Sequence, residues 1–201
     1  MTNKWNLREI VLMAILGVVF AVVYLFFFTV GTGITNLLTP FGLGPFGYEV
    51  IFGIWFIVSI ITAYIIRKPG AALISETIAG GVQVLMGSPA GPMLIVSALI
   101  QGLGAESAFA ATKYRNYSTG VLVAAGVGAA VFSFIWGLYH SGYMALSLPL
   151  LSSMLIVRVI SGALIAGLLG KWITERLADT GVLRSYALGK EWQSKREHRA
   201  S

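Results

Sequence analysis

Long apolar runs separated by short stretches rich in charge, Pro or Gly dominate this chain. Each run is close to the roughly 20 residues that a helix needs to cross the hydrocarbon of a bilayer. The charges, prolines and glycines that bound the runs predict six helices, at residues 10–30, 47–66, 70–87, 92–112, 119–144 and 150–172. We therefore expect an all-α polytopic membrane protein.

Composition supports this fold class and limits the chemistry. The 201 residues are 57% hydrophobic and 11% charged, whereas soluble domains carry about 25% charged residues. The length suits one six-helix domain over residues 1–178, followed by a basic tail over residues 179–201. Cysteine is absent, which excludes disulfides, thiolate metal ligands and a cysteine nucleophile.

The distribution of positive charge predicts the orientation in the membrane. Lys and Arg cluster at alternate connections, and such clusters normally face the cytoplasm. Both termini are therefore expected in the cytoplasm, with the 31–46, 88–91 and 145–149 connections outside. The 31–46 connection is long and rich in Gly and Pro, so it is expected to act as a lid. The basic tail is interpreted as an anchor at an anionic leaflet, and no nucleic acid is expected as partner.

Four ionisable residues interrupt the apolar runs. Glu49, Glu76 and Glu106 lie within or at the edge of three predicted spans. Arg158 lies well inside the sixth. A charge at this depth costs at least roughly 2.5–3.5 kcal/mol, so it normally faces a cavity, a partner or a ligand. We expect Arg158 to form a structural ion pair with Glu76 or Glu106.

Polar and aromatic residues converge on the outward half of the predicted bundle. Amides and carboxylates there suit the donor and acceptor edge of an aminopyrimidine, and an aromatic wall suits a flat cation. The candidate substrate-binding residues are Tyr48, Glu49, Glu76, Gln83, Gln101, Glu106, Trp136, Tyr139, His140 and Tyr143.

Several of these residues have a simpler interpretation. Trp136, Tyr139 and Tyr143 would also fit an aromatic belt at the membrane surface. His140 would then be a solvated or packing side chain. Glu106, nearest the cytoplasmic side, fits a packing or partner role equally well. The convergence of these residues, more than any one of them, predicts a binding pocket.

Signatures of enzymes and ATPases are missing from the sequence. It has no His-x-x-x-His or His-Glu-x-x-His pair and no Gly-x4-Gly-Lys-Ser/Thr phosphate loop. We therefore expect no enzymatic activity, no metal and no cofactor. Two other functions remain open: a carrier that acts alone, with Glu76, Glu106 and Arg158 as a proton relay, and a membrane enzyme or scaffold whose charges only lock helices together.

Small residues mark possible helix contacts. Ala14, Gly17 and Ala21 form a stripe on the first helix, which fits internal packing as well as a docking face. We assign it to the docking of a partner. The stripe that begins at Gly162, and the Ala/Gly-dense segment 124–130, are expected to pack inside the bundle.

The chain also resembles the S components of energy-coupling factor (ECF) transporters, over essentially its whole length. The stretches that carry the resemblance are Trp5–Val11, Phe46–Glu49, Glu76–Gly81 and Gln101–Glu106. Among S components it is most similar to the type that serves a bacterial thiamine/hydroxymethylpyrimidine permease. The resemblance implies a vitamin-capture subunit in the bacterial cell membrane. It further implies a transmembrane coupling subunit and two cytoplasmic ATPases as partners, with thiamine or a related aminopyrimidine as ligand.

Overall fold

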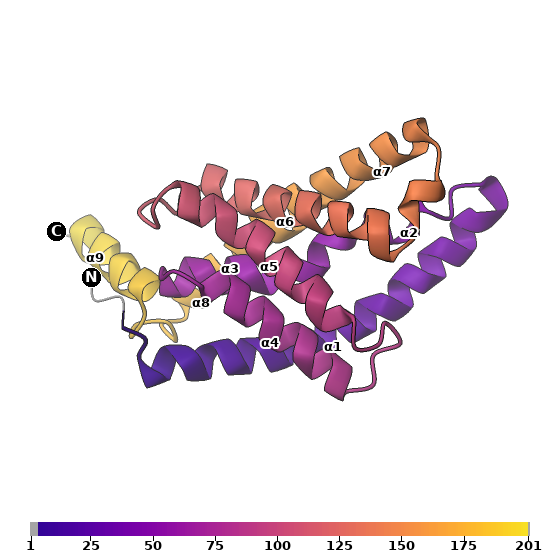
Figure 1. The fold of residues 1–201 in the computed structure, drawn as a ribbon. Helices are drawn as coiled ribbons and strands as arrows, with labels where there is room; N and C mark the ends of the chain where they lie inside the picture. The colour runs from indigo at the N-terminus through magenta and orange to yellow at the C-terminus, as the bar shows by residue number, and fades with distance from the viewer. Residues whose placement is uncertain (1–3, 201) are drawn as a thin grey trace.

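The computed structural model describes residues 4–200, and within that range every regular element is helical (Figure 1). The α-helices are α1 (Leu7–Leu38), α2 (Phe46–Glu49), α3 (Ile57–Ile66), α4 (Ala71–Leu85), α5 (Leu94–Ala111), α6 (Thr119–His140), α7 (Leu148–Ser161), α8 (Gly170–Asp179) and α9 (Ala187–Ala200). Short 3₁₀ segments are η1 (Thr39–Phe41), η2 (Phe52–Phe56) and η3 (Tyr143–Ala145), and η4 (Gly162–Leu169) is a π-helix. The all-α prediction is confirmed.

Four helical stretches are long and apolar enough to cross a membrane, and two further apolar helices are shorter. The long stretches are Leu7–Phe41, Leu94–Ala111, Thr119–His140 and Leu148–Asp179, and the short ones are Phe52–Ile66 and Ala71–Leu85. In chain order these six match the six predicted runs. The last is continuous because α7, η4 and α8 follow one another without a break.

Helix α3 forms the centre of the bundle. All ten of its residues are buried, and α1, α4, α8 and α9 pack around it. A helix that is apolar on all sides is stable only when neighbours cover it completely. Its polar residues Ser59 and Thr62 are also fully buried, so α3 provides buried polar groups as well as apolar packing.

Helix α1 extends further than the sequence predicted. It continues through Gly31 to Leu38, so the expected loop over residues 31–46 is wrong for its first half, and the connection to α2 covers only residues 39–45. Gly31 does not break the helix. Its missing side chain makes room for the ring of Tyr48, which would lie 2.5 Å from a Cβ at this position.

The second predicted helix, 47–66, is interrupted. Two short segments, α2 and η2, precede α3. The interruption occurs where Gly53 meets the last helical stretch, because a Cβ there would lie 2.4 Å from the carbonyl oxygen of Ser161. The Gly53 N–H donates a hydrogen bond to the Ser161 hydroxyl at 3.0 Å. This bond satisfies a backbone donor that a continuous helix would have used internally.

Small residues bring α6 and the last helical stretch close together, as predicted for internal packing. A Cβ on Gly162 would lie 2.6 Å from the carbonyl oxygen of Gly126. Helix α6 ends at His140, earlier than the predicted 144, and Tyr143 lies in η3. A Cβ on Gly137 would lie 2.8 Å from the Tyr143 ring, so that ring folds back onto α6.

The C-terminal segment packs against the bundle. Leu183 is 3% exposed and Leu188 is fully buried, and α9 contacts α3 and α8. In Figure 1, α9 lies at the same end of the molecule as the start of α1. This end also carries the positive clusters that include Arg67 and Lys113.

Candidate functional site

A cavity of about 270 Å³ lies at the opposite end of the bundle, where α4 and α6 end and α5 begins. Its lining residues are Phe28, Tyr48, Phe52, Trp55, Gln83, Ser88, Ala90, Leu94, Ser97, Gln101, His140 and Ser141. Four of the ten predicted binding residues are among them: Tyr48, Gln83, Gln101 and His140. The volume is just below the usual range for small-molecule pockets, about 300–1,000 Å³.

One side of the cavity is an aromatic wall supplied by the interrupted helix and α1. The ring of Tyr48 lies 5.8 Å from that of Trp55 and 5.8 Å from that of Phe28. Phe52 lies 5.7 Å from Trp55. The Tyr48 hydroxyl lies 2.7 Å from the Thr32 hydroxyl, which fixes the ring. Three of these rings, Tyr48, Phe52 and Trp55, lie in the interrupted segment before α3, and Phe28 on α1 completes the wall.

Two buried amides line the polar part of the cavity. Gln83 is 2% exposed and Gln101 is 7% exposed. Within residues 4–200, neither side chain has a hydrogen-bond partner in the protein. Among the described residues, the fully enclosed side-chain polar atoms without a partner are those of Thr35 and Thr62, so the two amides reach the cavity. Both amides are therefore available to a polar guest in the cavity.

Trp136 supports the cavity from behind. Its indole N–H donates to the hydroxyl of Ser97 at 2.9 Å. Its ring is stacked on His140, with centroids 5.2 Å apart and an interplanar angle of 12°. Ser97 and His140 line the cavity and Trp136 does not, so Trp136 positions two lining residues.

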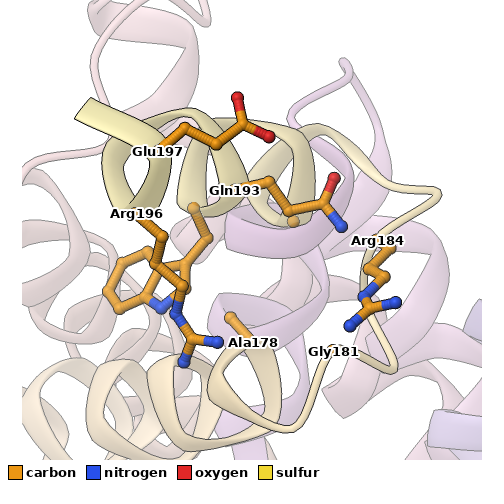
Figure 2. Close-up of a pocket in the computed structure, with 8 residues that line it drawn as sticks. Ala178, Gly181, Arg184, Gln193, Arg196 and Glu197 are labelled. Atoms are coloured by element: carbon orange, nitrogen blue, oxygen red, sulfur yellow. The ribbon is translucent and has the colours of Figure 1, made fainter. Parts of the chain in front are cut away.

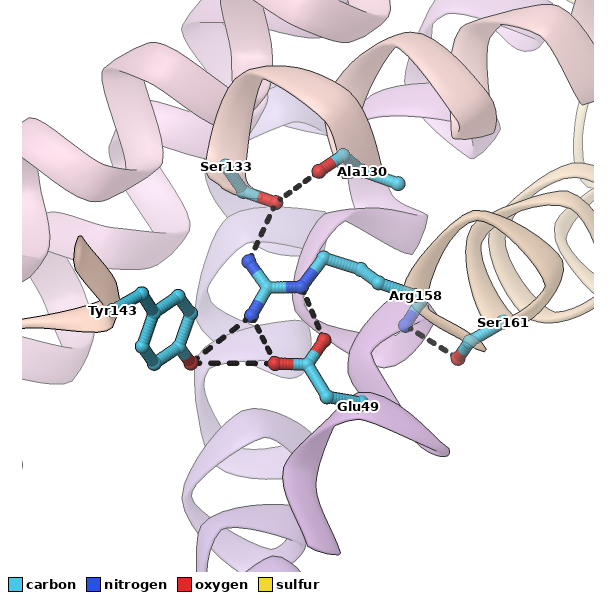
Figure 3. Close-up of polar contacts among 7 residues, drawn as sticks. Glu49, Ala130, Ser133, Tyr143, Arg158 and Ser161 are labelled. Atoms are coloured by element: carbon cyan, nitrogen blue, oxygen red, sulfur yellow. Dashed lines mark hydrogen bonds and ion pairs between the residues drawn. The ribbon is translucent and has the colours of Figure 1, made fainter. Parts of the chain in front are cut away.

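A buried ion pair joins α2 to α7 (Figure 3). Arg158 donates from Nε and Nη2 to the two carboxylate oxygens of Glu49, each at 2.5 Å. The side chains are 1% and 0% exposed. The Tyr143 hydroxyl lies 3.2 Å from Arg158 Nη2 and 3.3 Å from Glu49 Oε1. The Ser133 hydroxyl accepts from Nη1 at 3.4 Å.

The expected partner of Arg158 was therefore wrong, because Glu49 takes the place assigned to Glu76 or Glu106. The ion pair is linked to the cavity through Phe52. The guanidinium carbon of Arg158 lies 3.6 Å from the centroid of the Phe52 ring, and Phe52 lines the cavity. Glu49 and Tyr143 are thus behind the aromatic wall and do not line the cavity.

Glu76 is buried in the middle of the bundle, two helical turns below Gln83 on α4. It is 1% exposed and accepts hydrogen bonds from Ser59 at 2.7 Å and from Tyr24 at 3.4 Å. It joins α1, α3 and α4 and does not line the cavity.

Glu106 lies away from the cavity and caps the start of α4. Its carboxylate accepts backbone N–H bonds from Gly70 at 2.7 Å, Ala72 at 3.0 Å and Leu73 at 3.2 Å. The first N–H groups of a helix have no partner within the helix, and a negative charge there is favourable. The structure therefore separates Glu106 from the other candidate residues and supports the packing alternative.

Replacing Glu106 by alanine will lower the free energy of unfolding by about 1–3 kcal/mol, because three backbone donors lose their acceptor. Thermal unfolding of the detergent-purified protein measures the effect. Glu106→Gln will cost less, since its amide oxygen still accepts. Glu197→Ala, at an exposed position of the tail helix, serves as control, with an expected change within about 0.5 kcal/mol. An unchanged melting temperature for Glu106→Ala would contradict the capping role.

Tyr139 also lies outside the cavity. It is 72% exposed and borders a shallow apolar hollow with Phe132 and Ile135 on the outer surface of α6. This position agrees with the aromatic-belt alternative for Tyr139.

The small-residue stripe on α1 is used mainly inside the bundle. A Cβ on Gly17 would lie 2.5 Å from the side chain of Ile78 on α4, and Ala21 is fully buried. Only Ala14 of the three is exposed. The expected docking face Ala14/Gly17/Ala21 therefore does not exist as one exposed stripe.

A second hollow, of about 260 Å³, lies between α8 and α9 at the other end of the molecule (Figure 2). Arg196 reaches down from its rim towards Ala178, and Arg184 lies beside Gly181. The Arg196 guanidinium already donates to the Asp179 carboxylate at 2.9 Å. This hollow has one aromatic lining residue, Trp192, and lacks the wall of rings found in the first cavity.

Eight lining residues of the first cavity were absent from the prediction: Phe28, Phe52, Trp55, Ser88, Ala90, Leu94, Ser97 and Ser141. Phe52 and Trp55 lie in an apolar run, where a ring facing a cavity has the same sequence pattern as one facing lipid. The one available signal was Gly53, which interrupts this run.

Comparisons with known proteins identify the family. The family model described as "ABC-type cobalt transport system, permease component" matches residues 8–132. The putative HMP/thiamine permease protein YkoE of Bacillus subtilis (strain 168) is 54% identical over 195 residues, covering 97% of this chain and 96% of the relative. A crystal structure of an S-component of an ECF transporter superimposes with a TM-score of 0.93 at 53% identity, covering 98% of each chain. The chain therefore belongs to the S-component family of ECF transporters and is a multi-pass membrane protein.

Proposed function

We propose that this protein captures thiamine, or its hydroxymethylpyrimidine precursor, as the substrate-binding subunit of an ATP-driven importer. The relative named as an HMP/thiamine permease supports the ligand class. The observation that carries the proposal is the pair of buried amides, Gln83 and Gln101, that lie beside an aromatic wall without a partner in residues 4–200.

The two halves of thiamine match the two sides of the cavity. An aminopyrimidine presents both donors and acceptors, which the amides of Gln83 and Gln101 complement. The thiazolium ring is a flat permanent cation, which favours the faces of Tyr48 and Trp55 through cation–π attraction. The carboxylate of Glu49 is already neutralised by Arg158, so we assign cation recognition to the rings.

The proposed binding set is Tyr48, Gln83, Gln101 and His140 in contact with ligand, and Glu49, Glu76, Trp136 and Tyr143 as supports of the lining. Trp136 acts through Ser97 and His140, and Glu49 and Tyr143 act through Arg158 and Phe52.

We further propose six spans with both termini in the cytoplasm of a bacterium. Positive clusters at the end of the bundle that holds α9 face the cytoplasm, so the cavity at the opposite end opens outward. The protein would work in the plasma membrane with a transmembrane coupling subunit and two cytoplasmic ATPases. The S-component relationship supports these partners.

The geometry does not favour the stand-alone proton carrier. Its three relay residues have separate partners: Glu76 binds Ser59 and Tyr24, Glu106 caps α4, and Arg158 pairs with Glu49. A cobalt cargo, suggested by the description of the family model, also fits poorly. Within the described residues no group of three His, Cys, Asp or Glu side chains is placed to hold a metal ion.

Titration with thiamine of the detergent-purified protein, followed by intrinsic tryptophan fluorescence, tests this function. We expect a saturable change at submicromolar thiamine, because Trp55 lines the cavity. Trp55→Phe will remove most of the signal. Trp192→Phe, in the tail helix at the other end, will retain it. A parent protein that responds neither to thiamine nor to hydroxymethylpyrimidine would refute the proposed ligand.

A further inference from the structure

A further cavity, of about 440 Å³, lies at the end of the bundle opposite the cavity lined by Gln83 and Gln101. It is bordered by the end of α3, the start of α6 and the tail helix α9. Four cationic side chains line it, Arg67, Arg115, Lys171 and Lys195, against a single carboxylate, Glu191. When Glu175, the partner of Lys171, is also counted, these four cations exceed the neighbouring carboxylates by two charges. An unbalanced cluster of this kind attracts an anion.

The existing ion pairs use only part of this charge. Glu191 bonds both Arg67 and Lys195, and these contacts, that with Lys195 first, hold its pKa below the ordinary value. Lys171 pairs with Glu175 at 3.1 Å. Among the described residues Arg115 has no carboxylate within 4.0 Å of its guanidinium.

The start of α6 adds to the positive potential of the cavity. Two residues at this helix start line the cavity. Ser118 is the N-cap, and Thr119 is the first residue of the 22-residue helix. The first turn contains no acidic residue, so the partial positive charge of the helix end is not neutralised there. Backbone N–H groups at such a helix start bind phosphate oxygens readily.

The location of the cavity favours a lipid as the source of the anion. It lies where membrane-spanning helices begin and end, which is the depth of phospholipid headgroups. Beside Lys171, Trp172 is 54% exposed, and exposed tryptophans concentrate at that depth. Basic pockets between helices on the cytoplasmic side are known to hold anionic headgroups.

We propose that the cavity formed by Arg67, Arg115, Lys171 and Lys195 at the start of α6 binds the phosphate group of an anionic phospholipid. Because it lies at the other end of the bundle, this site does not depend on the identity of the transported ligand. Bound lipid would join α3, α6 and the tail helix on the face that carries the positive clusters.

The test is the melting temperature of the delipidated, detergent-purified full chain, measured against increasing phosphatidylglycerol. Phosphatidylcholine with the same acyl chains and inorganic phosphate at matched ionic strength are measured in parallel. A lipid that binds only the folded protein raises the melting temperature. We expect phosphatidylglycerol alone to do so, and Arg115→Gln to weaken its apparent affinity about fivefold, the effect typical of one cation at an anionic surface.

Matched variants distinguish binding in this cavity from a general effect of positive charge on the protein. Lys113→Gln removes a cation from the same turn but outside the cavity, and Lys190→Gln does so on α9. Both should bind phosphatidylglycerol as the parent does, whereas Lys195→Gln should weaken binding as Arg115→Gln does. Equal stabilisation by phosphatidylcholine, or equal losses in Lys113→Gln and Arg115→Gln, would overturn the proposal. Inorganic phosphate that reproduces the full shift would show a free-anion site and overturn the lipid assignment.

Discussion

A Glu49→Leu variant will lose about 3–5 kcal/mol of unfolding free energy, the usual cost of breaking a buried ion pair. The reason is the guanidinium that remains. Arg158 is 1% exposed, and its remaining hydrogen-bond partners in Figure 3 are the hydroxyls of Tyr143 and Ser133, which cannot neutralise it. The variant is therefore expected to accumulate poorly in membranes and to melt far below the parent in detergent.

Restoration by a second change will distinguish the ion pair from a simple loss of packing. Glu49→Leu combined with Arg158→Met removes both charges and keeps the volume apolar, and such replacements are often close to neutral in stability. We expect the double variant to recover most of the lost stability. A matched control is Glu175→Gln, which breaks the partly exposed pair with Lys171 and should cost less than about 1 kcal/mol. If Glu49→Leu melts like the parent, the pair does not hold α2 to α7.

A Gln83→Leu, Gln101→Leu double variant will lose thiamine affinity without losing stability. Each amide that pairs with a buried polar edge of the ligand is worth about 1–3 kcal/mol when its partner would otherwise be left unpaired. Loss of both should weaken binding by at least about 100-fold. In the ligand-free protein these amides have no bond to lose within the described residues, so the melting temperature should stay the same or rise.

Isothermal titration calorimetry with thiamine, together with thermal unfolding, measures both quantities. Gln193→Leu, on the exposed side of α9, is the matched control and should change neither affinity nor ligand-dependent stabilisation. Unchanged affinity in the double variant would remove the two amides from the binding set. A large loss of ligand-free stability would assign them a structural role.

Much of the fold followed from one-dimensional information. The length of each apolar run fixes whether a helix is long enough to cross a bilayer, and helices satisfy all their backbone groups locally. For this reason each of the six runs contains an apolar helix, four of them long enough to cross a membrane. Their ends were less certain. Gly31 had the pattern of a helix break but is needed for contact with Tyr48, and Gly53 had the same pattern and does mark a break.

The candidate site was likewise predicted only in part. Residue type and depth indicated Gln83, Gln101, Tyr48 and His140, because polar side chains within hydrocarbon must face something polar. Trp55 and Phe52 were missed, since rings are equally stable in lipid and in a pocket wall. Tyr139 and Glu106 had suitable chemistry, but the structure turns one to the surface and uses the other as a helix cap.

By itself the sequence determined that this protein is a helical membrane bundle, that its buried charges need partners, and that its positive clusters lie at one end. These properties depend on local composition and length. Only the tertiary structure decided which charges meet. Arg158 and Glu49 are 109 residues apart in sequence, and either Glu76 or Glu106 would have satisfied the same requirement for charge. The choice depends on the interruption before α3 and on the contact between Gly53 and Ser161, which bring α2 against α7.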